Sequence, residues 1–475
     1  MPGQGWDKSL SVSHLRFTSL GLRLPLRQGC AASEPRIAST QPDSKPRPSR
    51  LPIAITSPTV SLQKAKSQTS SFSFTNRFLD DAKAIEDETV RIRRTIHASP
   101  ELAFQEHQTS ALIAEELKRI GLRVQTRVGG TGVVGILGGE APGRVVLLRA
   151  DMDALPIKEL TGLEFASRTD GVMHACGHDG HVAMLLAAAR ILANHRKELQ
   201  GTVKFVFQPA EEAGEAGGGA KPMIEAGVME EPKVDYVFGL HIFTNYPSRT
   251  FALREGPLMA ASGTFRIRVV GRGGHGSAPH QTIDPVFISS QIITALQGIR
   301  SRMLDPLEPS VVSVCSVHSG TRNNIIPDEA TLEGTMRAVS EVTRKRVASL
   351  IPRIAHSVCR TYGAGCEVEM KDAYPVTAND PRTTKSVSGL LKSIPGTRTA
   401  EVPPLLTAED FSFFLRRAPG TYYFLGTRNA KKGCIYPNHS ARFRIDEDVL
   451  KYGSASLALL AFDFTGQRGH AGRTT

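Results

Sequence analysis

Short apolar runs alternate with helical patterns between residues 133 and 241, and this alternation constrains the fold more than any other feature. An Ala-, Leu- and Met-rich stretch at 181–193 predicts a buried helix. Strands are predicted where β-branched and aromatic residues cluster, at 133–137, 145–148, 203–207 and 236–241. The alternation is typical of an α/β sheet with helices on its faces. In such sheets ligands gather at the carboxyl ends of the strands.

The segment 174–181, with sequence HACGHDGH, places a thiol and three imidazoles just before the predicted helix. Cys176 and His178 are two residues apart, so their side chains can chelate one metal ion or reach two neighbouring ions. The alternative is a structural cysteine beside a helix-capping histidine. His174 and His181 belong either to the site or to its ordinary polar surroundings.

Two pairs of carboxylates also follow predicted strands. Glu211 and Glu212 are adjacent, and neighbouring side chains in an extended segment point to opposite sides. One could therefore bind a metal while the other acts as general base on a metal-activated water; a solvated acidic turn is the alternative. Asp151 and Asp153 flank one residue, so both can orient metal ligands from one side of a strand end, or serve as turn acids.

The pattern changes near Met259. Within 260–373, strands are expected at 265–270, 311–318, 330–339 and 366–371, and helices at 283–304 and 343–361. This order predicts a compact α+β unit with its own core. It interrupts the α/β unit, which then comprises residues 76–259 and 374–465.

Basic residues are concentrated in the first 75 residues, which hold ten Lys/Arg against three Asp/Glu. The rest of the chain therefore carries only +5 of the net charge of +12, and no nucleic-acid partner is expected. Residues 1–75 are rich in Ser, Pro and Arg and are expected to be disordered. An over-extended start ranks first as their origin and a transit peptide second. Residues 466–475 are expected to be a flexible end.

The chain has no run of eighteen apolar residues, so no membrane partner or span is expected. Its six cysteines are scattered through a long chain, which does not indicate a disulfide framework and fits a reducing compartment. We therefore expect a cytoplasmic protein, or a plastid or other organellar protein if the tail is a transit peptide.

Taken in order, these motifs resemble those of the di-metal N-acyl-amino-acid amidohydrolases. That family includes hippurate hydrolases, aminoacylases, thermostable carboxypeptidases and plant auxin-conjugate hydrolases. The resemblance covers about residues 78–463 and rests on RADMDALP (149–156), MHACGHD (173–179), QPAEE (208–212), GLH (239–241), GGHGSAPH (273–280), NIIP (324–327), GTMR (334–337), EDF (409–411) and His439. The chain departs from the family at Ala441, where proline is frequent.

The resemblance implies an α/β fold in which a mixed-sheet di-metal catalytic domain carries an inserted α+β lid and dimerisation domain. It implies two divalent metal ions per subunit, Zn²⁺, Mn²⁺ or Co²⁺, and Glu211 as the general base. The implied metal ligands are Cys176, His178, Glu212, His241 and His439.

The resemblance also implies roles for the inserted unit. His275 would reach the substrate from a neighbouring lid, and Asn324 and Arg337 would hold a substrate carboxylate. A homodimer or homotetramer through the lid is expected. We therefore predict a metal-dependent hydrolase that cleaves the amide bond between an acyl or peptidyl group and a C-terminal amino acid. Its substrates would be N-acyl amino acids or short peptides. The alternatives are a dipeptidase or carboxypeptidase proper, and a metal-binding homologue without catalysis.

Overall fold

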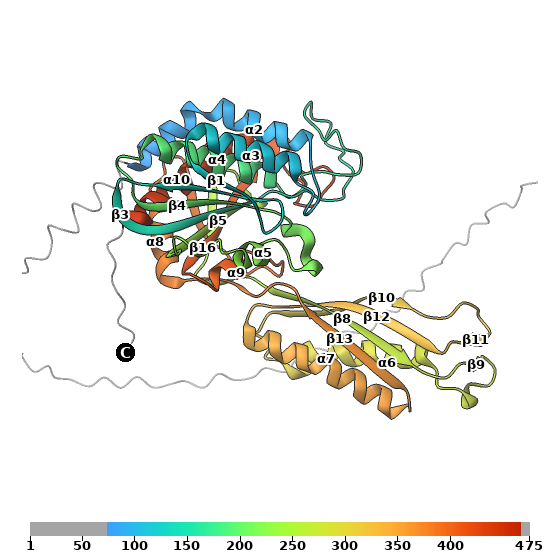
Figure 1. Ribbon diagram of the computed structural model, residues 1–475. Coiled ribbons are helices and arrows are strands. Elements are labelled where there is room, and N and C mark those ends of the chain that lie inside the picture. Colours follow the sequence, from blue (N-terminus) through green and yellow to red (C-terminus); the bar gives the residue numbers. More distant parts are fainter. Residues whose placement is uncertain (1–73, 467–475) are drawn as a thin grey trace, which may run out of the picture. The chain divides into compact units, whose positions relative to one another are not determined.

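The computed structural model describes residues 74–466, which build one large and one small β-sheet with their helices (Figure 1). Residues 74–84 are helical, so Phe74 and Thr75, which the sequence analysis placed in the tail, belong to a helix. The predictions for the tail and for the end of the chain otherwise lie outside the described residues. None of the helices between residues 74 and 466 is long and apolar enough to cross a membrane.

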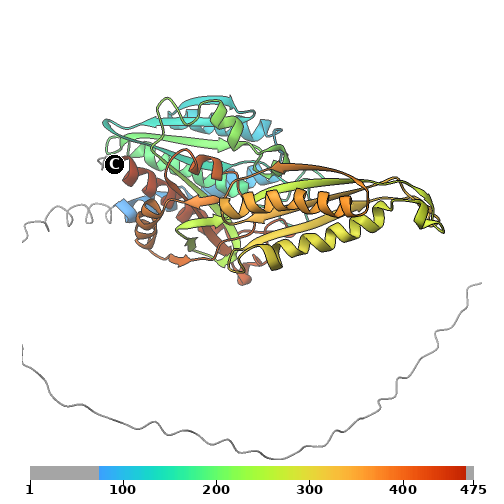
Figure 2. The same ribbon diagram turned by 90° about the horizontal axis from the view of Figure 1, so that it is seen from below.

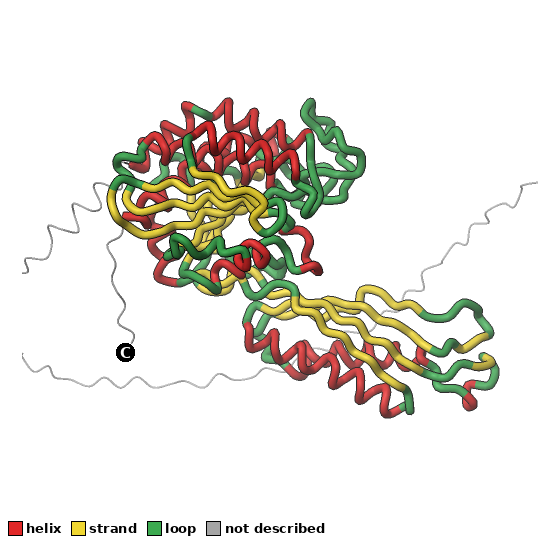
Figure 3. The backbone as a smooth tube through the Cα atoms, viewed as in Figure 1, coloured by secondary structure: helices red, strands yellow, loops and turns green. Residues whose placement is uncertain are grey.

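The larger sheet has eight strands and is mixed, as predicted (Figure 3). Its central strands β4, β3, β5 and β16 run parallel, whereas β1 and β2 at one edge are antiparallel to their neighbours. In spatial order the strands are β1 (Arg123–Val128), β2 (Gly132–Gly138), β4 (Gln200–Gln208), β3 (Ala141–Asp151), β5 (Tyr236–Pro247), β16 (Gly420–Arg428), β6 (Thr250–Leu253) and β15 (Arg398–Glu401).

Helices cover both faces of this sheet. One face packs against α2 (Glu86–Ala98), α3 (His107–Ile120), α4 (His178–Asn194), α8 (Pro381–Lys392) and α10 (Leu450–Gly466). The other packs against the short helices α5 (Ala220–Glu225) and α9 (Ser412–Leu415). The central strands are mostly apolar because both of their faces are buried.

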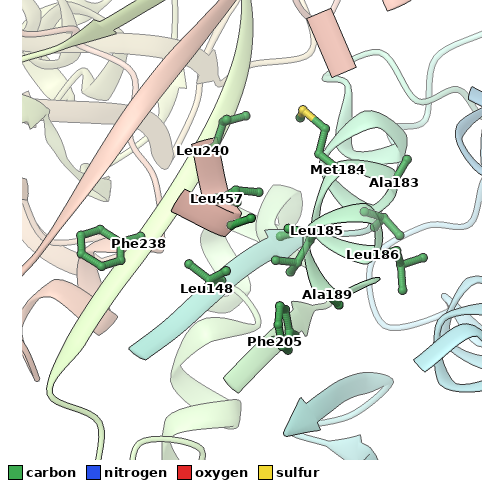
Figure 4. Packing of buried hydrophobic residues seen from close by; sticks show 14 of the residues in the cluster. Leu148, Ala183, Met184, Leu185, Leu186, Ala189, Phe205, Phe238, Leu240 and Leu457 are labelled. Atoms are coloured by element: carbon green, nitrogen blue, oxygen red, sulfur yellow. The ribbon is translucent and has the colours of Figure 1, made fainter. Parts of the chain in front are cut away.

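The side-chain period of two divides the strand residues between two cores. Leu148 and Phe205 belong to the core under α4, whereas Leu147 and Val206 belong to the opposite one. Figure 4 shows the first core, with Leu185 of α4 close to the side chains of the sheet. Helix α4 is apolar nearly all round because it lies between the sheet, α2 and α10. The segment 174–177, which precedes α4, is therefore anchored on a rigid element.

The smaller sheet has four antiparallel strands and a separate core. Two helices lie side by side on one of its faces (Figure 2). The elements are β10 (Ser310–His318), β12 (Glu329–Ala338), β8 (Ala261–Val270), β13 (Gly365–Asp372), α6 (Pro285–Gly298) and α7 (Glu341–Thr361). The helix expected at 283–304 is α6 followed by a π-helical turn, Ile299–Met303. The opposite face of the sheet carries polar side chains such as Arg266 and Glu333.

Two short strand pairs frame the smaller sheet. At its start and end, β7 (Gly256–Met259) pairs with β14 (Thr377–Asn379), so the chain leaves and returns at neighbouring positions. Farther along, β9 (Gly274–His275) pairs with β11 (Ile325–Ile326). The sequence predicted neither of these two short strands, because a pair of two-residue strands leaves no periodic signal.

Candidate metal centre

The parallel strands β3, β4 and β5 deliver polar side chains to one region at their carboxyl ends. Strand β3 ends at Asp151, β4 is followed by Glu211, and β5 contains His241. Helix α4 begins at His178, directly after Gly177, whose φ of +96° lies in the left-handed region. Glycine adopts this conformation without strain, which lets the loop turn sharply into the helix.

The structure brings all five predicted metal ligands together. Cys176 Sγ lies 3.4 Å from His241 Nε2, and His439 Nε2 lies 3.1 Å from Glu212 Oε1. His178 Nε2 is 4.0 Å from the same Glu212 oxygen. Their donor atoms form overlapping groups of three within 4.8 Å of one another. Cys176, His178 and His241 are buried, whereas the His439 side chain is 53% exposed.

Backbone carbonyls orient two of these histidines. Nδ1 of His178 is 2.9 Å from the Asp153 carbonyl oxygen, and Nδ1 of His241 is 2.7 Å from that of Ile242. A carbonyl oxygen can only accept, so each Nδ1 carries a proton, and in the neutral form of each ring the lone pair is on Nε2. Nε2 of His178 is buried and has no hydrogen-bond partner among the described residues. Both lone pairs are thus available to a cation.

Asp153 holds the two glutamates in place. Its carboxylate oxygens accept hydrogen bonds from the backbone N–H groups of Glu211 and Glu212, at 3.0 and 2.9 Å. The two glutamates begin a 3₁₀ helix, Glu211–Ala216, instead of continuing a strand, so the alternating geometry assumed from the sequence does not apply. Ala210, with φ of +54°, makes the turn into this helix.

A fully buried arginine on β3 contacts the carboxylates of two distant segments of the chain. Arg149 donates to Asp151 at 2.6 Å and to Asp410 at 2.7 Å, and it pairs with Glu409 at 3.0 Å. Although burial acts to raise it, Arg149 holds the pKa of Asp151 well below its usual range. Asp151 in turn lies against Nδ1 of His181. Sequence reasoning assigned no role to Arg149 or to the pair 409–410, although both stand in the motifs that carry the resemblance.

Negative charge is in excess around the donor cluster. Burial and the neighbouring carboxylates, first Glu409 and then Glu212, raise the pKa of Glu211 well above its usual range. Burial and Glu212 likewise raise the pKa of the Cys176 thiol. Buried carboxylates without counter-charge are costly, and bound cations relieve that cost. A thiol, three imidazoles and a carboxylate are ligands suited to divalent transition ions. The residues present therefore fit a metal centre.

The predicted residues of the smaller sheet separate into two places. His275 is exposed on β9, where its Nδ1 accepts hydrogen bonds from the N–H and hydroxyl of Ser277 at 3.1 and 2.7 Å. The Asn324 carbonyl accepts from Gly276 N–H at 2.9 Å, so Asn324 is next to His275. Both lie beyond the end of the four-stranded sheet marked by β9 and β11 in Figure 1.

Arg337 lies at the opposite end of that sheet. In the register of β12 against β8, Arg337 lies opposite Ser262, at the start of β8. The other end of β8, at Val270, adjoins the turn that leads to His275. Eight residues of extended strand separate the two positions, which is about 26 Å at 3.3 Å per residue. Arg337 is half-buried, and burial lowers its pKa. It helps to line a hollow of about 590 Å³ on the polar face of the sheet. Arg337 and Asn324 of one chain therefore cannot bind the same small anion.

A mixed α/β sheet that gathers a thiol, imidazoles and carboxylates at its strand ends defines a metallohydrolase. The chain belongs to peptidase family M20/M25/M40, whose model matches residues 147–463.

Two curated relatives and one solved structure illustrate the similarity. The chain is 54% identical to thermostable carboxypeptidase 2 of Saccharolobus solfataricus over 82% of its own length and 98% of that protein. It is 42% identical to IAA-amino acid hydrolase ILR1-like 4 of Arabidopsis thaliana, over 81% and 88% of the two chains. The YXEP protein of Bacillus subtilis, a dinuclear metal-binding peptidase of the M20 family, matches with a TM-score of 0.71 at 35% identity, over 81% and 99% of the two chains. The chain is thus a metal-dependent hydrolase of amide bonds.

Proposed function

We propose that this enzyme releases a C-terminal amino acid from N-acyl amino acids or short peptides by hydrolysing the amide bond. The observation that carries the proposal is the cluster of five donor side chains with one further carboxylate, Glu211, beside it. The names of the two relatives support the substrate class, since one is a carboxypeptidase and the other an amino-acid-conjugate hydrolase.

Two divalent ions, Zn²⁺, Mn²⁺ or Co²⁺, would be held by the five side chains that sequence analysis selected as ligands. Such ions, when bound, polarise a substrate carbonyl and make water more acidic. Asp151 and Asp153 contribute from the next layer. Asp153 does so through its carbonyl, which accepts from Nδ1 of His178, and Asp151 through its carboxylate, which accepts from Nδ1 of His181. Support of this kind fixes ring orientation and raises ligand basicity.

Glu211 is the proposed general base. It would take a proton from the attacking water and deliver it to the leaving nitrogen of the amino acid. Its backbone is held on both sides of the Cα atom, since Asp153 accepts from its N–H and the Tyr374 hydroxyl donates to its carbonyl at 2.6 Å. This leaves the carboxylate itself free for proton transfer. One carboxylate oxygen from each of Glu211 and Glu212 lies within 4.8 Å of a ring nitrogen of His178, which places the base beside the ligand cluster.

The residues of the smaller sheet complete the proposal. Arg337 would pair with the substrate carboxylate, for which a guanidinium is well suited. His275 and Asn324 would act on the site of a second copy of the chain, in a homodimer or homotetramer formed through residues 260–373. The separation of about 26 Å along β8 supports this division, because one lid cannot bring both ends to one small substrate.

A substrate panel tests the proposed function. Metal-loaded enzyme is assayed on N-acetyl, N-benzoyl and N-benzyloxycarbonyl amino acids, on dipeptides, and on matched N-acyl amino acid amides. We expect turnover of free-carboxylate substrates, loss of turnover after chelation, and weak turnover of the amides. Equal turnover of acids and amides would contradict a carboxylate-binding role. Faster turnover of dipeptides than of every acylated substrate would favour a dipeptidase or carboxypeptidase proper.

Metal analysis tests the ligand set. Cys176→Ala should lower bound metal as well as rate, because it removes a buried donor atom of the cluster. Glu211→Gln should lower rate alone. Unchanged metal stoichiometry in Cys176→Ala would make Cys176 a structural residue.

A further inference from the structure

The turn that leads into Glu211 and Glu212 is built on a residue in an unusual backbone conformation. Ala210 has φ of +54°, in the left-handed region that residues other than glycine rarely adopt. Such a conformation persists only where the surrounding structure holds it. The side chains of Glu211 and Glu212 follow directly, so any relaxation at Ala210 would redirect both carboxylates.

One buried side chain from a distant part of the sequence holds this turn. Oε1 of Glu106 accepts a hydrogen bond from Ala210 N–H at 2.9 Å and another from Phe104 N–H at 3.0 Å. Its other oxygen accepts from the Thr131 hydroxyl. Phe104 is also in the left-handed region, with φ of +60°. Glu106 therefore fixes two strained backbone positions at once.

Three successive backbone N–H groups of the turn each donate a hydrogen bond to a carboxylate. Ala210 N–H points to Glu106, and the N–H groups of Glu211 and Glu212 point to the two oxygens of Asp153. A buried N–H without an acceptor is costly, so each bond constrains the path of the chain. Asp153 alone would hold the second and third amides but not the peptide that sets their direction.

Helix capping does not explain Glu106. It occupies the N-cap position of α3, yet its side chain makes no capping hydrogen bond. That task belongs to Glu101, whose carboxylate accepts from the N–H groups of Gln108 and Thr109, both at 2.9 Å. Glu106 is also fully buried and makes no ion pair with a cation in residues 74–466. Burial, with Asp153 adding to it, raises the pKa of Glu106.

We propose that Glu106 is a positioning residue for the reaction. It fixes Ala210 and thereby sets the directions in which Glu211 and Glu212 present their carboxylates. The inference rests on the proposed roles of these two glutamates.

The test compares Glu106→Ala, Glu106→Gln and the matched control Glu101→Ala. Metal-free protein is titrated with Co²⁺ and its visible absorption recorded, and kcat, KM and melting temperature are measured on the loaded enzymes. Glu106→Ala should lower kcat about ten- to a hundredfold with a much smaller change in KM, and should alter the Co²⁺ spectrum. Glu106→Gln should restore both, because its amide oxygen can still accept from Ala210.

Glu101→Ala should lower the melting temperature through loss of the α3 cap but keep kcat and the spectrum of the wild type. The proposal is overturned if Glu106→Ala keeps both, or if the two alanine variants lose kcat in proportion to their loss of melting temperature. The Co²⁺ spectrum distinguishes failure of the Glu106 proposal from failure of the proposed function. If Glu211→Gln stays active, the base assignment fails, while an altered spectrum in Glu106→Ala still reports that Glu106 positions Glu212.

Discussion

The strand ends of the large sheet and the tip of the small sheet each present a histidine, and the two are held very differently. His178 is buried, and a backbone carbonyl of another segment fixes its ring. His275 is exposed, and within residues 74–466 its ring is hydrogen-bonded only to Ser277, two residues along the same turn. A preorganised group needs support from several elements, whereas a group that acts after association does not. The metal-centre histidine is thus held in place within the chain, whereas the exposure of His275 fits the proposed role at the site of a second copy of the chain.

Two arginines extend this comparison to electrostatics. Arg149 contacts Asp151 and Asp410 with no exposure to solvent. Arg268, on the polar face of the small sheet, contacts Glu329 and Glu367 with 43% of its side chain exposed. Both arginines contact carboxylates, but solvent screens only the contacts of Arg268. Burial, more than the number of partners, decides what each arginine contributes.

The largest effect is expected from Glu211→Gln. The amide cannot accept a proton, and loss of a general base typically lowers kcat about a hundred- to ten-thousandfold. Metal content and melting temperature should stay close to those of the wild type, because the backbone contacts of residue 211 remain. Steady-state kinetics and elemental analysis check this. Activity within about threefold of the wild type would remove Glu211 from the mechanism.

His275→Ala tests the other side of the comparison. We expect a fall in kcat of about a hundred- to a thousandfold if the histidine stabilises the reacting carbonyl, with metal content and stability unchanged because the side chain is exposed. Mixing this variant with Glu211→Gln under conditions that exchange subunits should recover activity, since one hybrid site has both groups. Exchange without recovery would rule out a shared site.

Arg149→Met and Arg268→Met form a matched pair for stability. Removing Arg149 leaves Asp151, Glu409 and Asp410 buried without their cation, which should lower the free energy of unfolding by about 3–5 kcal/mol. Arg268→Met should cost much less, because water replaces the lost contacts. Urea denaturation of the two variants at equal metal loading measures both. Equal losses would show that partner number outweighs burial.

Most of the fold is encoded locally and was predictable. The strands and helices of the smaller sheet were located to within a few residues, because β8 and β12 alternate with period two and α7 is amphipathic. The grouping of the proposed ligands was predictable as well, since Cys176 and His178 lie at the start of a helix, Glu212 follows a strand and His241 lies within one. In each case the signal lies within a few residues of its effect.

What the sequence did not predict depends on contacts between distant segments. Ala210 has a left-handed backbone conformation and is followed by the 3₁₀ helix that contains Glu211 and Glu212. The motif QPAEE does not predict a positive φ at this position. The bond from Ala210 to Glu106 spans 104 positions of sequence. The distance between Arg337 and His275 required the register of β8 against β12. These features arise from tertiary packing, which a single sequence does not display.

The pairing of β7 with β14 has a consequence for how this architecture can change over time. Met259 and Thr377 face each other across one strand spacing, which is about 4.8 Å. The residues between them therefore form one long insertion whose two ends lie next to each other beside the large sheet. The entropy of closing such a loop grows only slowly with its length, by about 0.6 kcal/mol for each doubling. Residues 260–373 can therefore be lengthened, exchanged for those of a relative or replaced by a short turn with little penalty for closing the chain. Substrate preference and assembly could diversify in this way while the metal-binding strand ends stay as they are.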